Sequence, residues 1–169
     1  MPNLYKCAYT KNEMFSDAYP TKDVFNGFVF EVETEIVEKE AMKFNMGDCD
    51  DLDDQSSRVN NLVDGHLLVN AGFDKKTFQV WAKGYIGKIT KQFKEDHKVE
   101  EGDQLLKDFK TNVTALIKDA LDNFGEYEFY LGEDNDIEGC LGLSKWTDSK
   151  NDKGPKFYFI KQGLIKEKI

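Results

Sequence analysis

The side chains that most often carry catalysis are scarce in this 169-residue sequence. It contains two histidines, His66 and His97, and three cysteines, Cys7, Cys49 and Cys140. No Cys-x-x-Cys pair, His-Glu-x-x-His helix, glycine-rich phosphate loop or Gly-x-Ser-x-Gly nucleophile motif occurs in it. An odd number of widely spaced cysteines is typical of reduced thiols in a cytosolic protein. These residues therefore give no support to nucleophilic or zinc-dependent catalysis.

Two acidic segments contain the residue types that hold calcium, since this ion takes carboxylate and carbonyl oxygens. The first, 48–54, lacks the glycine found at the sixth position of an EF-hand loop. The second contains Asp134, Asp136 and Glu138, but Lys145 stands where such a loop needs a glutamate. Neither is expected to be an EF-hand. Weak calcium binding at the second segment and ordinary solvated turns both stay open.

Four lysines recur at spacings of three, three and four residues, namely Lys88, Lys91, Lys94 and Lys98. Such spacings place side chains roughly on one face of a helix. A basic stripe on an acidic protein can attract an acidic surface of a partner. The alternative interpretation is an ordinary solvated helix face.

The composition predicts a folded domain that spans residues 1–169 and does not bind nucleic acids in general. The chain has 23 basic and 32 acidic residues, a net charge of −9, and 13% aromatic residues. A negative protein repels phosphate backbones, while so many aromatic groups can fill a core. No segment is apolar enough to span a membrane or act as a signal peptide. We therefore expect a cytoplasmic protein, with release by a route independent of signal peptides left open.

Alternating apolar and polar side chains predict several β-strands. The clearest signal covers residues 27–40, where Phe28, Phe30 and Val32 alternate with Glu31 and Glu33. This pattern favours an antiparallel strand with one apolar face and one largely acidic face. Shorter strands are predicted at residues 4–9, 59–69, 127–131, 140–146 and 156–160.

The apolar period becomes helical in the middle of the chain. Apolar residues spaced by three or four predict helices over 78–93 and 105–124. Their short polar connector makes them an antiparallel hairpin, which spans 78–124. Residues 41–60 are acidic and lack a period, which predicts a mobile loop. Strands, two helices and further strands in this order indicate the α+β class with mainly antiparallel sheets.

Several blocks of the sequence resemble the translationally controlled tumour protein family. Residues 12–17 read Asn-Glu-Met-Phe-Ser-Asp, and residues 27–35 are similar to the first long strand of that family. Residues 129–133 and 138–146 have the spacing of its carboxyl-terminal signature, and the helical pair has the matching place. The resemblance covers nearly the whole chain. It implies twisted β-sheets, called a β-tent and shared with Rab-binding chaperones, from which the helical hairpin protrudes.

The resemblance also implies a regulatory binding protein of the cytoplasm that needs no cofactor. The family is linked to growth and translation, and to small Ras-like GTPases, a translation elongation factor, tubulin and calcium. Carried over by position, Glu13 and Glu133 would face the GTPase, and we expect them to lie close together. The resemblance also implies that the hairpin would bind tubulin, through the stripe of Lys88, Lys91, Lys94 and Lys98.

Other roles for Glu13 and Glu133 stay open. Each carboxylate could instead cap a turn or helix, or accept hydrogen bonds from nearby backbone amides. A small enzyme that uses the two carboxylates as an acid–base pair is the alternative function. An enclosed pocket around them would favour the enzyme, and an open surface would favour the binding protein.

Overall fold

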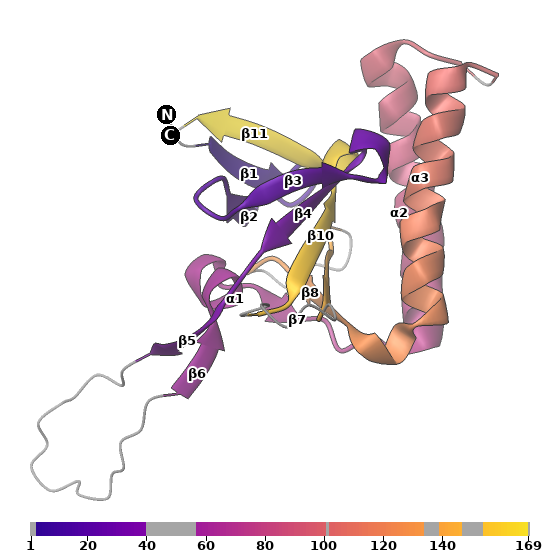
Figure 1. Ribbon diagram of the computed structural model, residues 1–169. Helices are drawn as coiled ribbons and strands as arrows, with labels where there is room; N and C mark the ends of the chain where they lie inside the picture. Colours follow the sequence, from indigo (N-terminus) through magenta and orange to yellow (C-terminus); the bar gives the residue numbers. More distant parts are fainter. Residues whose placement is uncertain (1–2, 40–56, 101, 134–138, 147–153, 169) are drawn as a thin grey trace, which may run out of the picture.

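The computed structural model describes residues 3–39, 57–100, 102–133, 139–146 and 154–168. Figure 1 shows two long helices standing beside a body of antiparallel strands. The described strands form sheets of six, three and two strands, and their orders leave each sheet open rather than closed into a barrel. The predicted α+β class is confirmed.

The six-stranded sheet runs in the order β3-β4-β10-β9-β8-β7. Every neighbouring pair in it is antiparallel. Its centre joins distant parts of the chain, because Phe30 lies opposite Phe159. The strands are β3 (Thr21–Val24), β4 (Val29–Glu33), β7 (Val69–Asn70), β8 (Tyr127–Leu131), β9 (Gly142–Lys145) and β10 (Lys156–Ile160).

The three-stranded sheet has the order β11-β1-β2, and the two-stranded ribbon pairs β5 with β6. The ribbon projects away from the rest of the molecule (Figure 1). The predicted strand at 27–40 is therefore divided into β4 and β5, and the end of the predicted loop is a strand, β6. The strands are β1 (Asn3–Cys7), β2 (Glu13–Ser16), β5 (Ile36–Lys39), β6 (Ser57–Asn60) and β11 (Leu164–Lys168).

The acidic side of β4 is not wholly solvated, contrary to the alternating pattern. Glu31 is only 8% exposed. Its carboxylate lies 3.3 Å from Lys22 Nζ and 3.8 Å from Lys156 Nζ, and the Tyr158 hydroxyl donates to it at 2.9 Å. These partners come from β3 and β10, on either side of β4. Cross-strand cations therefore allow a carboxylate to be buried where the sequence pattern predicts a solvent-facing one.

The predicted helical hairpin is present as α2 (Lys75–His97) and α3 (Gln104–Asp122). The Asp74 side chain caps α2 by accepting from the Thr77 amide at 2.7 Å. Both helices begin before the first residue of their apolar stripe, because a polar first turn needs no core contact. Short 3-10 helices lie at Phe25–Gly27, Phe124–Glu126 and Lys161–Gly163.

The strand predicted at 59–69 is wrong, since its centre forms a helix, α1 (Asn61–His66). Asn60 caps this helix, because its side chain accepts from the amides of Leu62 and Val63 at 2.9 and 3.1 Å. The helix ends at Leu67, whose φ of 56° is left-handed. An apolar run without a clear period fits either element, and here the asparagine cap favours the helix.

The core joins the hairpin to the sheets through stacked aromatic rings. The ring of Phe78 in α2 lies 4.4 Å from that of Phe129 in β8, centroid to centroid. The rings of Phe15 in β2 and Phe159 in β10 stack at 4.7 Å. All four side chains are almost completely buried. Among the described helices, none has the length and apolar character needed to cross a membrane.

Candidate functional site

Glu13 lies at the start of β2 and faces α1. Its side chain is 53% exposed, and Oε2 lies 3.7 Å from Nδ1 of His66, whose side chain is 11% exposed. This distance suits a weak electrostatic contact but is too long for a hydrogen bond. Burial lowers the pKa of His66, although the Glu13 carboxylate acts in the opposite direction. His66 is therefore mainly neutral at pH 7 and does not cancel the charge of Glu13.

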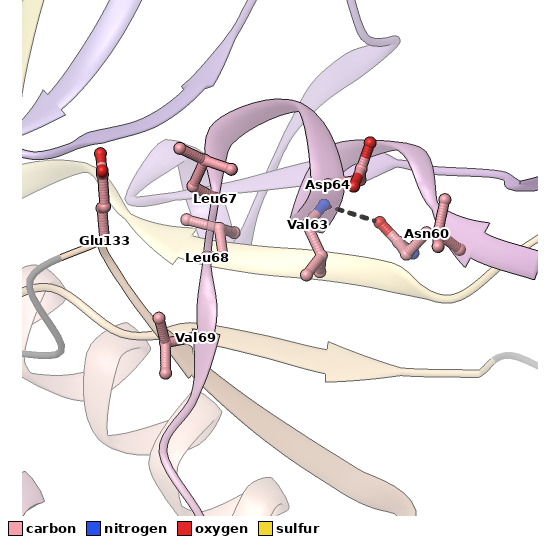
Figure 2. A pocket seen from close by; sticks show the side chains of 8 residues that line it. Asn60, Val63, Asp64, Leu67, Leu68, Val69 and Glu133 are labelled. Carbon is pink, nitrogen blue, oxygen red and sulfur yellow. Dashed lines mark hydrogen bonds between the residues drawn. The ribbon is translucent and has the colours of Figure 1, made fainter. Parts of the chain in front are cut away.

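Glu133 follows β8 and borders a shallow groove beside α1 (Figure 2). The groove is open to solvent rather than enclosed. Apolar side chains form most of its surface. It is lined by Val59, Asn60, Val63, Asp64, Leu67, Leu68, Val69 and Glu133.

The segments that carry Glu13 and Glu133 are in contact. A Cβ atom added to Gly132 would lie 2.5 Å from Cβ of Asn12, so only glycine fits at this point. The following residue in each segment is one of the two glutamates. The fold thus brings together two loops that are far apart in the sequence, and it places both carboxylates on the side of the molecule where α1 lies.

Leu67 is a residue of this site that the sequence analysis does not single out. It is 55% exposed and has a φ of 56°. A left-handed conformation costs a non-glycine residue roughly 1–2 kcal/mol. Its amide caps α1 by donating to the Val63 carbonyl. Leu67 adopts this conformation because it ends α1. The apolar pattern predicts a strand at this position, so it gives no sign of a left-handed residue.

We call the surface formed by Glu13, Asp64, His66, Leu67 and Glu133 the acidic face. It combines carboxylates with one exposed leucine. Such a surface can attract a basic partner by charge and exclude water through its apolar side chain.

The structure divides the predicted lysine stripe. Lys88 lies over the Tyr9 ring, with Nζ 4.2 Å from the ring centroid. Lys91 and Lys94 instead line a groove that Lys83 and Lys110 also border. The reason is helical geometry, because each step of three residues turns the side chain back by about 60°. Lys98 ends α2, as its left-handed cap residue.

The calcium candidates Asp134, Asp136 and Glu138, and most of the predicted loop at 41–60, lie outside the described residues. Within the described part of the chain, no group of three or more His, Cys, Asp or Glu residues is arranged to hold a metal ion. The metal prediction therefore stays a prediction.

The chain is similar to proteins of one family along nearly its whole length. The family model described as translationally controlled tumour protein matches residues 3–165. The translationally-controlled tumor protein homolog of Lateolabrax japonicus is 32% identical over 174 residues, which cover 98% of each chain. The homolog of Gibberella zeae is 30% identical over 174 residues, covering 98% of this chain and 99% of the relative.

Solved structures agree with this match. The translationally controlled tumor-associated protein of Schizosaccharomyces pombe superposes with a TM-score of 0.80 at 28% identity and covers 99% of both chains. The fold is also that of the Caenorhabditis elegans protein, with a TM-score of 0.70, 20% identity, and coverage of 99% of this chain and 98% of the other. This chain therefore belongs to the translationally controlled tumour protein family.

Proposed function

We propose that this protein is a cytoplasmic regulatory binding protein that docks small Ras-like GTPases through its acidic face. The observation that supports the proposal is the contact between Asn12 and Gly132, which puts the loops of Glu13 and Glu133 side by side. Carboxylates held at the ends of rigid strands can pair with the lysine or arginine side chains of a nucleotide-binding loop. The exposed Leu67, which lines the same groove as Glu133, adds an apolar anchor.

The open shape of the groove argues against the alternative, an enzyme with Glu13 and Glu133 as acid and base. General acid–base catalysis depends on perturbed carboxyl groups, and burial is what perturbs them most. Glu13 is half exposed, and the groove beside Glu133 is open. A binding surface makes better use of exposed carboxylates, since their charge stays available to a partner.

We propose a second docking role for the four lysines that line the groove of the hairpin. The α2 and α3 helices contribute Lys83, Lys91, Lys94 and Lys110 to this groove. Its positive charge suits an acidic surface such as that of tubulin. The family resemblance also suggests a translation elongation factor as a partner. Asp134, Asp136 and Glu138 are candidates for weak calcium binding on the basis of their residue types.

The test of the GTPase proposal is a titration against a panel of Ras-like GTPases, each without nucleotide, with GDP and with a GTP analogue. The variants are Glu13→Gln and Glu133→Gln, which remove charge but keep shape. Glu95→Gln, an exposed carboxylate on the hairpin, is the matched control. We expect each face variant to weaken binding about tenfold or more, because losing one partner of a desolvated charge pair costs on the order of 2–5 kcal/mol.

Thermal melts of the same variants separate binding from folding. A surface substitution away from caps and core stays within about ±0.5 kcal/mol. Unchanged melting with weaker binding supports the proposal. Equal affinities of wild type and both face variants, or a large loss of stability in Glu13→Gln, would show that these carboxylates serve the fold.

A further inference from the structure

Cys7 and Cys140 lie together in the core although they are far apart in the sequence. Cys7 is the last residue of β1 and Cys140 lies just before β9, and both are buried free thiols. The Cys140 amide donates to the Cys7 sulfur at 3.1 Å. The amides of Tyr9 and Thr10 approach the same sulfur at 3.4 Å. Three backbone donors therefore converge on the Cys7 sulfur, which is the environment that a thiolate needs.

The surroundings of Cys140 differ. Its thiol donates to the Gly163 carbonyl at 2.8 Å, and the Tyr85 hydroxyl lies 3.2 Å from its sulfur. The backbone amide of Ala8 also acts on this sulfur and lowers the pKa of the Cys140 thiol, but less than burial raises it. Burial and the acceptor at Gly163 favour the neutral thiol of Cys140, and burial outweighs the Tyr85 hydroxyl and the Ala8 amide, which favour its charged form.

The electrostatics of the two sulfurs follow from these contacts. The Cys140 thiol is the main cause that lowers the pKa of Cys7 to about 5, and the backbone amides add to it. Burial raises the pKa of Cys140 well above its usual value. The opposite directions of these pKa shifts make Cys7 the sulfur that ionises more readily, and the Cys140 amide, 3.1 Å from it, keeps the second thiol beside the first.

We propose that Cys7 and Cys140 form a peroxide-sensitive thiol pair that closes into an intramolecular disulfide. In the first step the Cys7 thiolate attacks one oxygen of hydrogen peroxide, which gives a sulfenic acid and releases hydroxide. In the second step the Cys140 sulfur displaces the hydroxyl group from that sulfenic acid as water, and its proton is consumed. Overall, two thiols and one peroxide give one disulfide and two waters.

Access to the pair is through the turn that follows β1. Residues 8–10 are partly exposed and Lys11 is exposed, with a left-handed φ of 66°. A turn at the surface opens more readily than the core strands. Hydrogen peroxide is small enough to enter through a limited opening of this kind.

The proposal is tested on the full chain with Cys49→Ser, which leaves only the pair. After treatment with hydrogen peroxide, free thiols are counted in denaturant and the intact mass is measured. We expect both thiols to be lost together, with a mass decrease of two hydrogens and a linked peptide that contains Cys7 and Cys140. Retention of both thiols in the folded protein, or linkage only between chains, would overturn the proposal.

Single variants in the same background establish the order of steps. In Cys140→Ser, we expect the sulfenic acid of Cys7 to persist and to be trapped by dimedone. In Cys7→Ser, Cys140 should stay reduced. Equal rates of oxidation of Cys140 with and without Cys7 would contradict the assigned order. Circular dichroism of each variant confirms that the thiols are compared in the folded state.

Tyr85→Phe offers a milder variant that keeps both cysteines. The Tyr85 hydroxyl stabilises the charged form of Cys140, since its hydrogen bond lowers the pKa of that thiol. Without the hydroxyl, we expect disulfide closure to slow several-fold while the first oxidation of Cys7 keeps its rate. A slower first step with an unchanged second step would contradict this role.

Discussion

The acidic face and the thiol pair lie at opposite ends of one turn, residues 7–12, and they use it differently. The Cys7 amide donates to the Asn12 carbonyl at 2.8 Å, so that the turn is closed on itself. At one end the Cys7 sulfur is buried and has several donors, whereas at the other end Glu13 is half exposed and lies 3.7 Å from His66. Changes at the thiol pair should therefore affect stability first, and changes at the acidic face should affect binding first.

The largest effect is expected from Gly163→Ala beside the thiol pair. An added Cβ would overlap the buried Tyr85 hydroxyl and lie 3.0 Å from the Cys140 sulfur. Overpacking of this kind costs about 1–3 kcal/mol of unfolding free energy. The measurement is urea unfolding. Gly84→Ala in α2 is the control, since nothing lies within 4 Å of its Cβ position and alanine favours a helix by about 0.8–1 kcal/mol.

On the acidic face, Leu67→Gly should separate binding from folding. Glycine relieves the left-handed strain of Leu67 but gains entropy in the unfolded chain, so stability should change by less than about 1 kcal/mol. Loss of the apolar anchor should weaken GTPase binding several-fold. Calorimetric titration and thermal melts of one preparation check both parts. A drop in stability with unchanged affinity would mean that Leu67 serves the fold.

A smaller effect is expected from pH through His66. Burial holds the pKa of His66 below its usual value of 6.5, so the native state binds fewer protons than the unfolded chain. His66 therefore contributes stability above pH 6.5, which is lost as the pH falls through that value toward the lowered native pKa. Urea unfolding at a series of pH values should show a shallower loss in His66→Gln. Identical slopes for the two proteins would contradict the burial of a neutral histidine.

The smallest difference is expected between two lysines of α2. Lys88→Gln removes the contact with the Tyr9 ring, which is worth about 0.5–1 kcal/mol at an exposed site. Lys91→Gln changes an exposed groove residue and should leave stability within about ±0.5 kcal/mol. Paired thermal melts measure the difference. Equal melting temperatures would show that the division of the lysines has no energetic meaning.

The sequence predicts elements with a clear period and misses those set by single side chains. The stripe from Phe78 to Phe93 identifies α2, because helix and core demand the same spacing. The helix α1 depends on the hydrogen bonds of Asn60, which no apolar period records. Burial of Glu31 depends on cations from other strands.

The candidate site shows the same limit more strongly. Glu13 and Glu133 can be selected only by resemblance, and the contact that joins their loops is made by Asn12 and Gly132. Cys7 and Cys140 have no common motif, since they approach each other only through the three-dimensional fold. Contacts between distant segments have no signature in local spacing, which is why the thiol pair is a finding of the structure.

The pairing of β1 with β11 affects the time course of folding. Leu4 of β1 lies opposite Glu167 of β11, and β4 likewise pairs with β10, a strand from much later in the sequence. During synthesis on the ribosome, β1 and β4 therefore emerge with an open edge that only the last part of the chain can cover. The helical hairpin needs only local contacts and forms early, whereas closing such long loops is slow. The nascent chain thus exposes unpaired strand edges until β10 and β11 emerge, and this is the interval in which it most needs protection from aggregation.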